Sequence, residues 1–98
     1  MKVIWSDTAL ARLLEIDEYI RRDNPLAATD LVDALIERGV SLAKFPEKGR
    51  EVPELAGSGL RELITGNYRL VYRAAEKRID ILTVFEAHRL FPLSDIEE

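Results

Sequence analysis

The residues of this chain whose types and spacing could support chemistry lie in its C-terminal third. Three arginines, Arg61, Arg69 and Arg73, alternate there with apolar residues, and His88 and Arg89 follow. A guanidinium group binds phosphates and carboxylates through parallel N–H donors, and a histidine can exchange a proton near neutral pH. These five side chains are therefore the candidate residues for binding a target or partner.

The alternation of these residues indicates that they lie on β-strands. Between residues 60 and 91 the apolar period is two, and Gly66-Asn67 suits a tight turn. The pattern predicts a three-strand antiparallel meander, with one face packed on a core and the other presenting the arginines. Its three strands are expected at Leu60–Thr65, Tyr68–Arg73 and Ile79–Phe85.

Two helices are expected before the meander. Ser6 is a good N-cap, and the first helix should run from Asp7 to about Arg22. Its buried face is expected to carry Ala9, Leu13, Ile16 and Ile20. Pro25 suits the first turn of a second helix that extends to about Lys44. The apolar stripe of this second helix is wide, so we expect it to lie between the first helix and the sheet.

The remaining segments complete the predicted fold. Lys2–Trp5 contains β-forming residues and is expected to join the meander as the fourth strand of a mostly antiparallel sheet. Residues 46–59 hold two prolines and three glycines, and they predict an ordered loop anchored by Phe45, Val52 and Leu55. The expected fold class is α+β with the order β-α-α-β-β-β, in one domain over residues 1–98.

Composition excludes several classes of site. The chain has no cysteine, which excludes disulfides, thiol catalysis and thiolate metal centres, and its single histidine excludes a His-rich metal cluster. We therefore expect no cofactor. No apolar run approaches the ~20 residues of a membrane helix, and the N-terminal apolar stretch is too short for a signal peptide. A cytoplasmic protein without a membrane partner is expected.

The charge distribution separates the two halves of the chain. The net charge is −4, which argues against indiscriminate coating of nucleic acid. Residues 1–59 hold 11 acidic residues against eight lysines and arginines, whereas residues 60–91 hold four against six, with His88 in addition. The sheet is therefore expected to be mildly basic and the helices acidic.

Several motifs together resemble a known family. They are WSxxAxxxLxxIxxYI, NPxAA, FPxxGRxVPEL, RELITGNYRLVYR and IDILTVFEAHR. In this combination and spacing they are similar to the RelE/ParE superfamily of bacterial type II toxins, over Lys2 to Phe91. The resemblance implies a small sheet backed by a helical hairpin. It also implies a growth-inhibiting protein that a cognate antitoxin neutralises in a hetero-oligomer, with acidic antitoxin residues against Arg61 and Arg69.

One mechanism in that superfamily is cleavage of messenger RNA on the ribosome. Such cleavage needs a base, an acid and cations for the phosphate. If the chain is RelE-like, the resemblance makes Arg69 the family's arginine and His88 a candidate acid or base. The lysines that several such nucleases carry on the first meander strand are absent, and Leu60 and Glu62 stand nearby. Glu62 is expected to be a solvent-facing ion-pair partner rather than a base.

The other mechanism is ParE-like poisoning of DNA gyrase, which demands a binding surface and no bond-making group. The acidic net charge, the missing lysines and the VPEL loop resemble this branch, which we favour. A simpler role for the arginines is cross-strand pairing with Glu62, Asp80 or Glu86, worth about 0.2–1 kcal/mol when exposed. A non-toxic protein-interaction domain, with a sheet groove that receives a partner helix or strand, is a further alternative.

Overall fold

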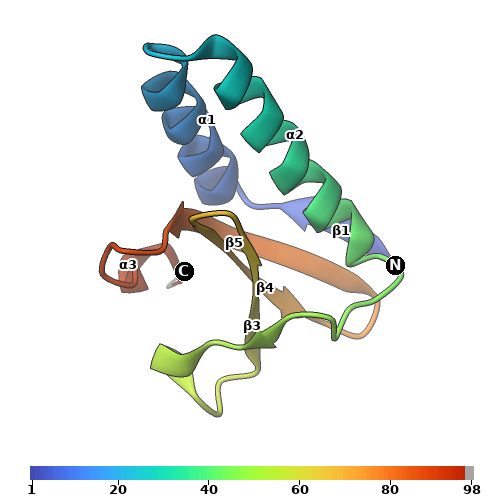
Figure 1. The fold of residues 1–98 in the computed structure, drawn as a ribbon. Coiled ribbons are helices and arrows are strands. Elements are labelled where there is room, and N and C mark those ends of the chain that lie inside the picture. The colour runs from blue at the N-terminus through green and yellow to red at the C-terminus, as the bar shows by residue number, and fades with distance from the viewer. Residues whose placement is uncertain (97–98) are drawn as a thin grey trace.

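The computed structural model describes residues 1–96, in which a helical hairpin lies on one face of a five-stranded sheet (Figure 1). The helices are α1 (Asp7–Arg21), α2 (Pro25–Ser41) and α3 (Leu93–Ile96), with a 3-10 turn η1 (Pro53–Leu55). The strands are β1 (Lys2–Trp5), β2 (Arg50–Glu51), β3 (Leu60–Thr65), β4 (Tyr68–Ala74) and β5 (Arg78–Glu86). No helix among these described residues is long and apolar enough to cross a membrane.

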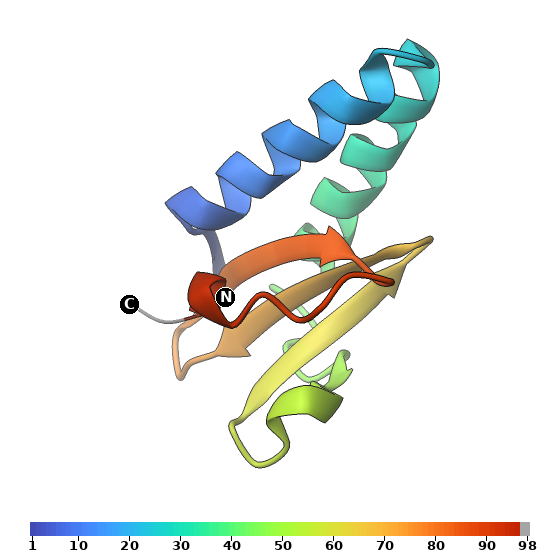
Figure 2. The ribbon, with the colours of Figure 1, turned by 90° about the vertical axis from the view of Figure 1, so that its left-hand side faces the viewer.

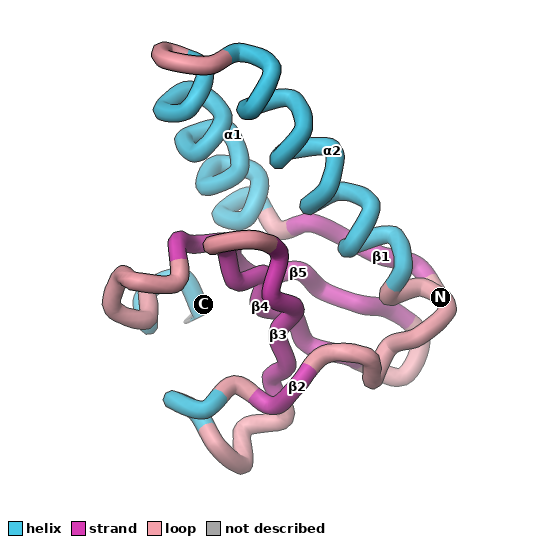
Figure 3. The backbone as a smooth tube through the Cα atoms, in the orientation of Figure 1, coloured by secondary structure: helices cyan, strands magenta, loops and turns pink. Residues whose placement is uncertain are grey.

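The order of the strands in the sheet is β1-β5-β4-β3-β2. Figure 3 shows these strands in magenta along the backbone. β1 runs parallel to β5, while all other neighbours are antiparallel. The predicted α+β fold with a meander is confirmed, but the sheet has five strands rather than four. The extra strand, β2, consists of Arg50 and Glu51 paired with β3. Two polar residues are too few to produce a period-two pattern.

The helix boundaries follow from local hydrogen bonds. The Ser6 hydroxyl accepts a bond from the Ala9 N–H at 3.0 Å, and Asn24 Oδ1 accepts one from the Ala27 N–H at 3.0 Å. α2 ends at Ser41, three residues before the predicted end. The Leu42 N–H bonds to the Gly39 carbonyl at 3.1 Å, so the last turn tightens toward 3-10 geometry.

The two helices lie side by side on the sheet, which corrects the expectation that α2 separates α1 from it (Figure 1). α1 packs on β5 and buries Ala9 and Leu13, whereas α2 buries Leu35. The outer residues Ile36 and Val40 of α2 are exposed. Because α1 lies beside α2 and does not cover it, the part of the apolar stripe of α2 that faces away from the sheet is exposed.

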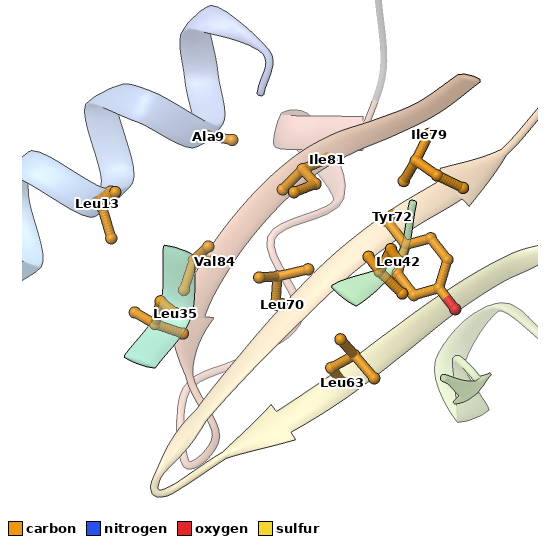
Figure 4. Packing of buried hydrophobic residues seen from close by; sticks show 10 residues of the cluster. All are labelled: Ala9, Leu13, Leu35, Leu42, Leu63, Leu70, Tyr72, Ile79, Ile81 and Val84. Carbon is orange, nitrogen blue, oxygen red and sulfur yellow. The ribbon is translucent and has the colours of Figure 1, made fainter. Parts of the chain in front are cut away.

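The apolar core between the hairpin and the sheet is the helix-side cluster (Figure 4). It contains Ala9, Leu13, Leu35, Leu42, Leu63, Leu70, Tyr72, Ile79, Ile81 and Val84. Gly39 lets α2 approach this cluster closely. A Cβ added to Gly39 would lie 3.0 Å from Ile81 Cδ1 and 3.2 Å from Trp5 Cζ2. The glycine thus marks a close approach between α2 and the sheet, and Trp5 lies beneath α2 at this point.

The opposite face of the sheet carries a second apolar core, the far-side cluster, which consists of Val52, Leu60, Val71, Leu82 and Phe85. The C-terminal segment crosses this face in front of the strands (Figure 2), and Phe91 and Ile96 pack on the cluster. The expectation of an open face of guanidinium groups is therefore wrong. The meander strands carry apolar residues on both sides, and the C-terminal segment covers part of the second face, while Arg73 on that face stays exposed.

The loop between α2 and β3 is anchored as predicted at two of its three apolar positions. Val52 is fully buried and Leu55 packs on the far-side cluster. Phe45 is exposed, so the prediction that it anchors the loop is wrong. The centre of its ring lies 5.9 Å from the Lys44 ammonium.

Candidate functional site

The three meander arginines do not form one cationic surface. Neighbouring residues in a strand face opposite sides of the sheet, and Leu60 and Val71 belong to the far-side cluster. Arg61 therefore lies on the helix side, where its Nη1 donates to the Gly49 carbonyl at 2.7 Å. Arg69 and Arg73 lie on the far side, and Arg73 is exposed.

Arg69 is buried, with 7% of its surface exposed, and each of its three guanidinium nitrogens donates a hydrogen bond. Its Nε donates to Glu62 Oε1 at 2.7 Å. Its Nη1 and Nη2 donate to the two carboxylate oxygens of Glu54 at 2.8 Å and 2.6 Å. The guanidinium carbon lies 4.9 Å from the ring centre of Phe85 and 5.6 Å from that of Phe91. Bidentate carboxylate bonds and aromatic rings of this kind stabilise the charge of a buried guanidinium.

Glu62 links Arg69 to a second arginine. The Arg50 Nε donates to Glu62 Oε2 at 2.7 Å, and the Glu62 side chain is wholly buried. The prediction of an ion-pair role for Glu62 is confirmed, but the prediction of solvent exposure is wrong. Arg50, Glu54, Glu62 and Arg69 thus form a four-residue ion network whose two positive and two negative charges sum to zero.

Two members of the ion network, Glu54 and Arg69, have pKa values shifted by their pairing. Hydrogen bonds from Arg69 lower the pKa of Glu54 to about 2, well below its ordinary value of 4.5. Hydrogen bonds to Glu54, and then to Glu62, raise the pKa of Arg69 above its ordinary range despite burial. Glu54 and Arg69 are therefore fixed charges, and neither exchanges a proton under physiological conditions.

His88 and Arg89 lie in the turn after β5 and are exposed. The His88 backbone N–H bonds to the Glu86 carboxylate, while its imidazole makes no hydrogen bond or ion pair within residues 1–96. Arg89 lines a groove of about 360 Å³ between α1 and the ends of β4 and β5. The groove is lined by Arg12, Glu15, Ile16, Tyr19, Tyr68, Val84, Phe85, Glu86 and Arg89. Within residues 1–96 no hydrogen bond or ion pair joins His88 to the ion network of Arg50, Glu54, Glu62 and Arg69.

Three residues that sequence reasoning missed fasten the C-terminal segment. Arg12 of α1 donates from Nη2 and Nε to the two carboxylate oxygens of Asp95 at 2.7 Å and 2.9 Å. The Thr83 hydroxyl also donates to Asp95 at 2.9 Å. Arg12 and Asp95 are separated by 83 positions, so no local pattern could pair them. Glu54 was also missed, although the VPEL motif that contains it formed part of the family resemblance.

A family model described as the ParE toxin of the type II toxin–antitoxin system parDE matches residues 3–91. The chain belongs to this family. It is thus a type II toxin of the RelE/ParE superfamily, which confirms the resemblance. Toxin RelE2 of Caulobacter vibrioides is 38% identical over 90 residues, covering 91% of this chain and 98% of that protein. The putative toxin Y4kP of Sinorhizobium fredii is 37% identical over 93 residues, covering 93% of each.

Two solved structures share the fold of this toxin. A chromosomal ParDE toxin–antitoxin system from P. aeruginosa matches with a TM-score of 0.77 and 23% identity, over 90% of this chain and 97% of that one. The toxin–antitoxin complex RelBE2 from Mycobacterium tuberculosis matches with a TM-score of 0.64 and 22% identity, over 87% and 95%. The similar proteins carry both ParE and RelE names, so the chemistry of the site must separate the two mechanisms.

Proposed function

We propose that this toxin arrests growth by binding DNA gyrase and that a cognate antitoxin neutralises it. The observation that carries the proposal is the state of Arg69, which is buried and bonded to Glu54 and Glu62. A nuclease must present a cation to the phosphate and place an acid or base within reach of the reacting oxygen. A protein target requires only a complementary surface.

Electrostatics also favour a protein target. The ion network is neutral and the whole chain carries a net charge of −4. Of the five candidate residues, Arg61 and Arg69 use their guanidinium groups internally, which leaves Arg73, His88 and Arg89 exposed. Binding to the anionic ribosome gains most from free lysines and arginines. Three scattered exposed groups suit a mixed protein interface better.

The antitoxin is the second proposed partner, because the structural neighbours of this chain include toxin–antitoxin complexes. A partner segment that orders on binding needs apolar anchors and a rim of charge. The groove between α1 and the sheet offers both, through Ile16, Tyr19, Tyr68 and Arg89.

Ribosome-dependent cleavage of messenger RNA is the second candidate function. It is favoured by the similarity to a toxin named RelE2 and by the exposed imidazole of His88. The remaining alternative, a non-toxic interaction domain, is set aside because the chain belongs to a toxin family.

The deciding experiment uses purified toxin in two assays, one for gyrase supercoiling with cleavage-complex accumulation and one for messenger cleavage in a translating extract. The expected result is gyrase inhibition that survives His88→Ala. His88→Ala is the informative variant because it removes an exposed imidazole, whereas Arg69→Ala would also leave buried Glu62 short of a partner. Messenger cleavage that His88→Ala abolishes, with gyrase unaffected, would overturn the proposal.

A further inference from the structure

The carboxylate that closes off Arg69 comes from an exposed loop. The Glu54 side chain is 40% exposed, whereas that of Arg69 is 8% exposed. Glu54 belongs to the single turn η1, and residues 56–59 after it are all exposed. Gly57 and Gly59 have φ angles of 85° and 83°, and a Cβ added to either would meet no atom within 4 Å. This loop is held to the sheet by Val52, Leu55 and the Glu54–Arg69 pair.

The two acidic partners of Arg69 differ in how firmly the fold holds them. Glu62 lies on β3, is wholly buried and bonds to Arg69 Nε, so it fixes the orientation of the guanidinium group. Glu54 occupies the two outer donors, Nη1 and Nη2. Departure of Glu54 would leave two parallel N–H groups already aimed at a carboxylate. Such preorganised donors bind without the entropic cost of ordering the side chain.

The charge of the site changes with Glu54. With Glu54 in place the ion network is neutral, and without it Arg50 and Arg69 exceed Glu62 by one positive charge. Phe85 and Phe91 lie against the guanidinium group of Arg69 and exclude water from its flanks. A hydrogen bond to a charged group is stronger in such surroundings than in water.

We propose that Arg69 is a masked carboxylate-binding site, that Glu54 is its internal ligand, and that an acidic side chain of a partner protein displaces Glu54. A protein carboxylate is the favoured ligand because a glutamate side chain already fits the site with both oxygens bonded. The net charge of −4 disfavours a polyanion such as RNA. The inference uses the same Arg69 ion pairs as the proposed function but names no target, since it concerns one site and one ligand chemistry.

The experiment compares Glu54→Gln with the native toxin, using hexaglutamate peptide as the probe and NMR of the Arg69 Nε–H as the readout. Glu54→Gln should strengthen hexaglutamate binding about tenfold, because the Glu54 carboxylate no longer competes for Arg69. Binding should also shift the NMR signal of the Arg69 Nε–H. Glu47→Gln is the matched control, because Glu47 is an exposed loop acid outside the ion network. A Glu54→Gln, Arg69→Lys double variant should lose the gain, since lysine has no bidentate fork.

A second variant keeps the test decisive if Glu54→Gln does not fold, as judged by far-UV circular dichroism. Glu54→Asp retains the charge but shortens the side chain, so hexaglutamate should bind with an intermediate gain. The proposal is overturned if the folded variants bind hexaglutamate no better than Glu47→Gln. It is also overturned if hexauridylate binding increases as much as hexaglutamate binding, since the site would then recognise phosphate.

Discussion

Arg69 makes charge-assisted hydrogen bonds through Nε, Nη1 and Nη2 and lies beside the rings of Phe85 and Phe91. Burying a charge is costly unless it is paired and hydrogen-bonded, and the ion network meets that condition. Removal of any one member leaves a buried charge, either Glu62 or Arg69, with one partner fewer. At the residue scale the ion network therefore stabilises the fold, whether or not a partner binds the loop that contains Glu54.

Replacement of Arg69 with alanine should lower the free energy of unfolding by about 3 kcal/mol, because it leaves the buried Glu62 carboxylate with Arg50 alone. Urea denaturation followed by circular dichroism measures this change. Arg73→Ala on the same strand removes an exposed guanidinium and should cost no more than about 0.5 kcal/mol. Equal costs for the two variants would contradict a structural role for the ion network.

The Glu54–Arg69 pair should make stability depend on pH in a defined window. The pKa of Glu54 falls from 4.5 to about 2 in the folded protein, so the native state binds fewer protons than the unfolded state between these values. The stability from this pair is therefore complete above pH 4.5 and is lost as pH falls toward 2.

This pH dependence is measured as the difference in Tm between the native toxin and Glu54→Gln from pH 7 to pH 3. The difference should be constant down to about pH 4.5 and should then shrink. Asp95, whose pKa Arg12 also lowers, is present in both proteins and cancels in the comparison. A difference that grows on acidification would show that Glu54 is not held in its charged form.

At the scale of elements, the C-terminal segment depends on one carboxylate. α3 comprises only Leu93–Ile96, and a helix of that length is not stable alone. Asp95 holds it through Arg12 and Thr83, and only 4% of the Asp95 side chain is exposed. Phe91 adds an edge-to-face contact with Phe85 at 5.4 Å. The segment is thus fastened at both ends over the far-side cluster.

Asp95→Asn should release this segment while the sheet stays folded. Loss of hydrogen bonds to a buried charged group costs about 1–3 kcal/mol, which corresponds to roughly ten- to hundredfold faster amide exchange in residues 91–96. Hydrogen–deuterium exchange with mass spectrometry measures this. Glu15→Gln is the control because Glu15 also pairs with Arg12 but is exposed. Similar exchange in both variants would show that Asp95 does not fasten the segment.

At the scale of the whole molecule, one sheet supports two apolar clusters. The helix-side cluster and the far-side cluster use alternate residues of the same strands, such as Leu70 and Val71 of β4. If the strands separate, the apolar residues of both clusters become exposed to water. The hairpin should therefore unfold with the sheet in one cooperative transition.

Coincident denaturation curves test this cooperativity. Trp5 is the single tryptophan and packs beneath α2 near Gly39, so its fluorescence reports on contact between the hairpin and the sheet. Circular dichroism reports on helices and strands throughout. The two urea midpoints should agree, and an earlier fluorescence transition would show that the hairpin separates first.

Local chemistry was sufficient to predict α1, α2 and four of the five strands of this toxin. Ser6 caps α1 as expected, and the boundaries of the four predicted strands differ from prediction by no more than one residue at either end. These features depend on periodicity, capping and turn residues that are near neighbours in the chain. The family resemblance in turn required only the order and spacing of such motifs.

Burial and partnership of the charged residues depended on the tertiary structure. Alternation showed that Arg69 lies on one face of the sheet, but it carried no information on what covers that face. Glu54 reaches Arg69 across 15 positions, and Asp95 reaches Arg12 across 83. A polar side chain pairs with whatever the fold brings within hydrogen-bond distance, irrespective of sequence spacing. Arg69, predicted to lie on a cationic surface, is therefore buried within a neutral ion network.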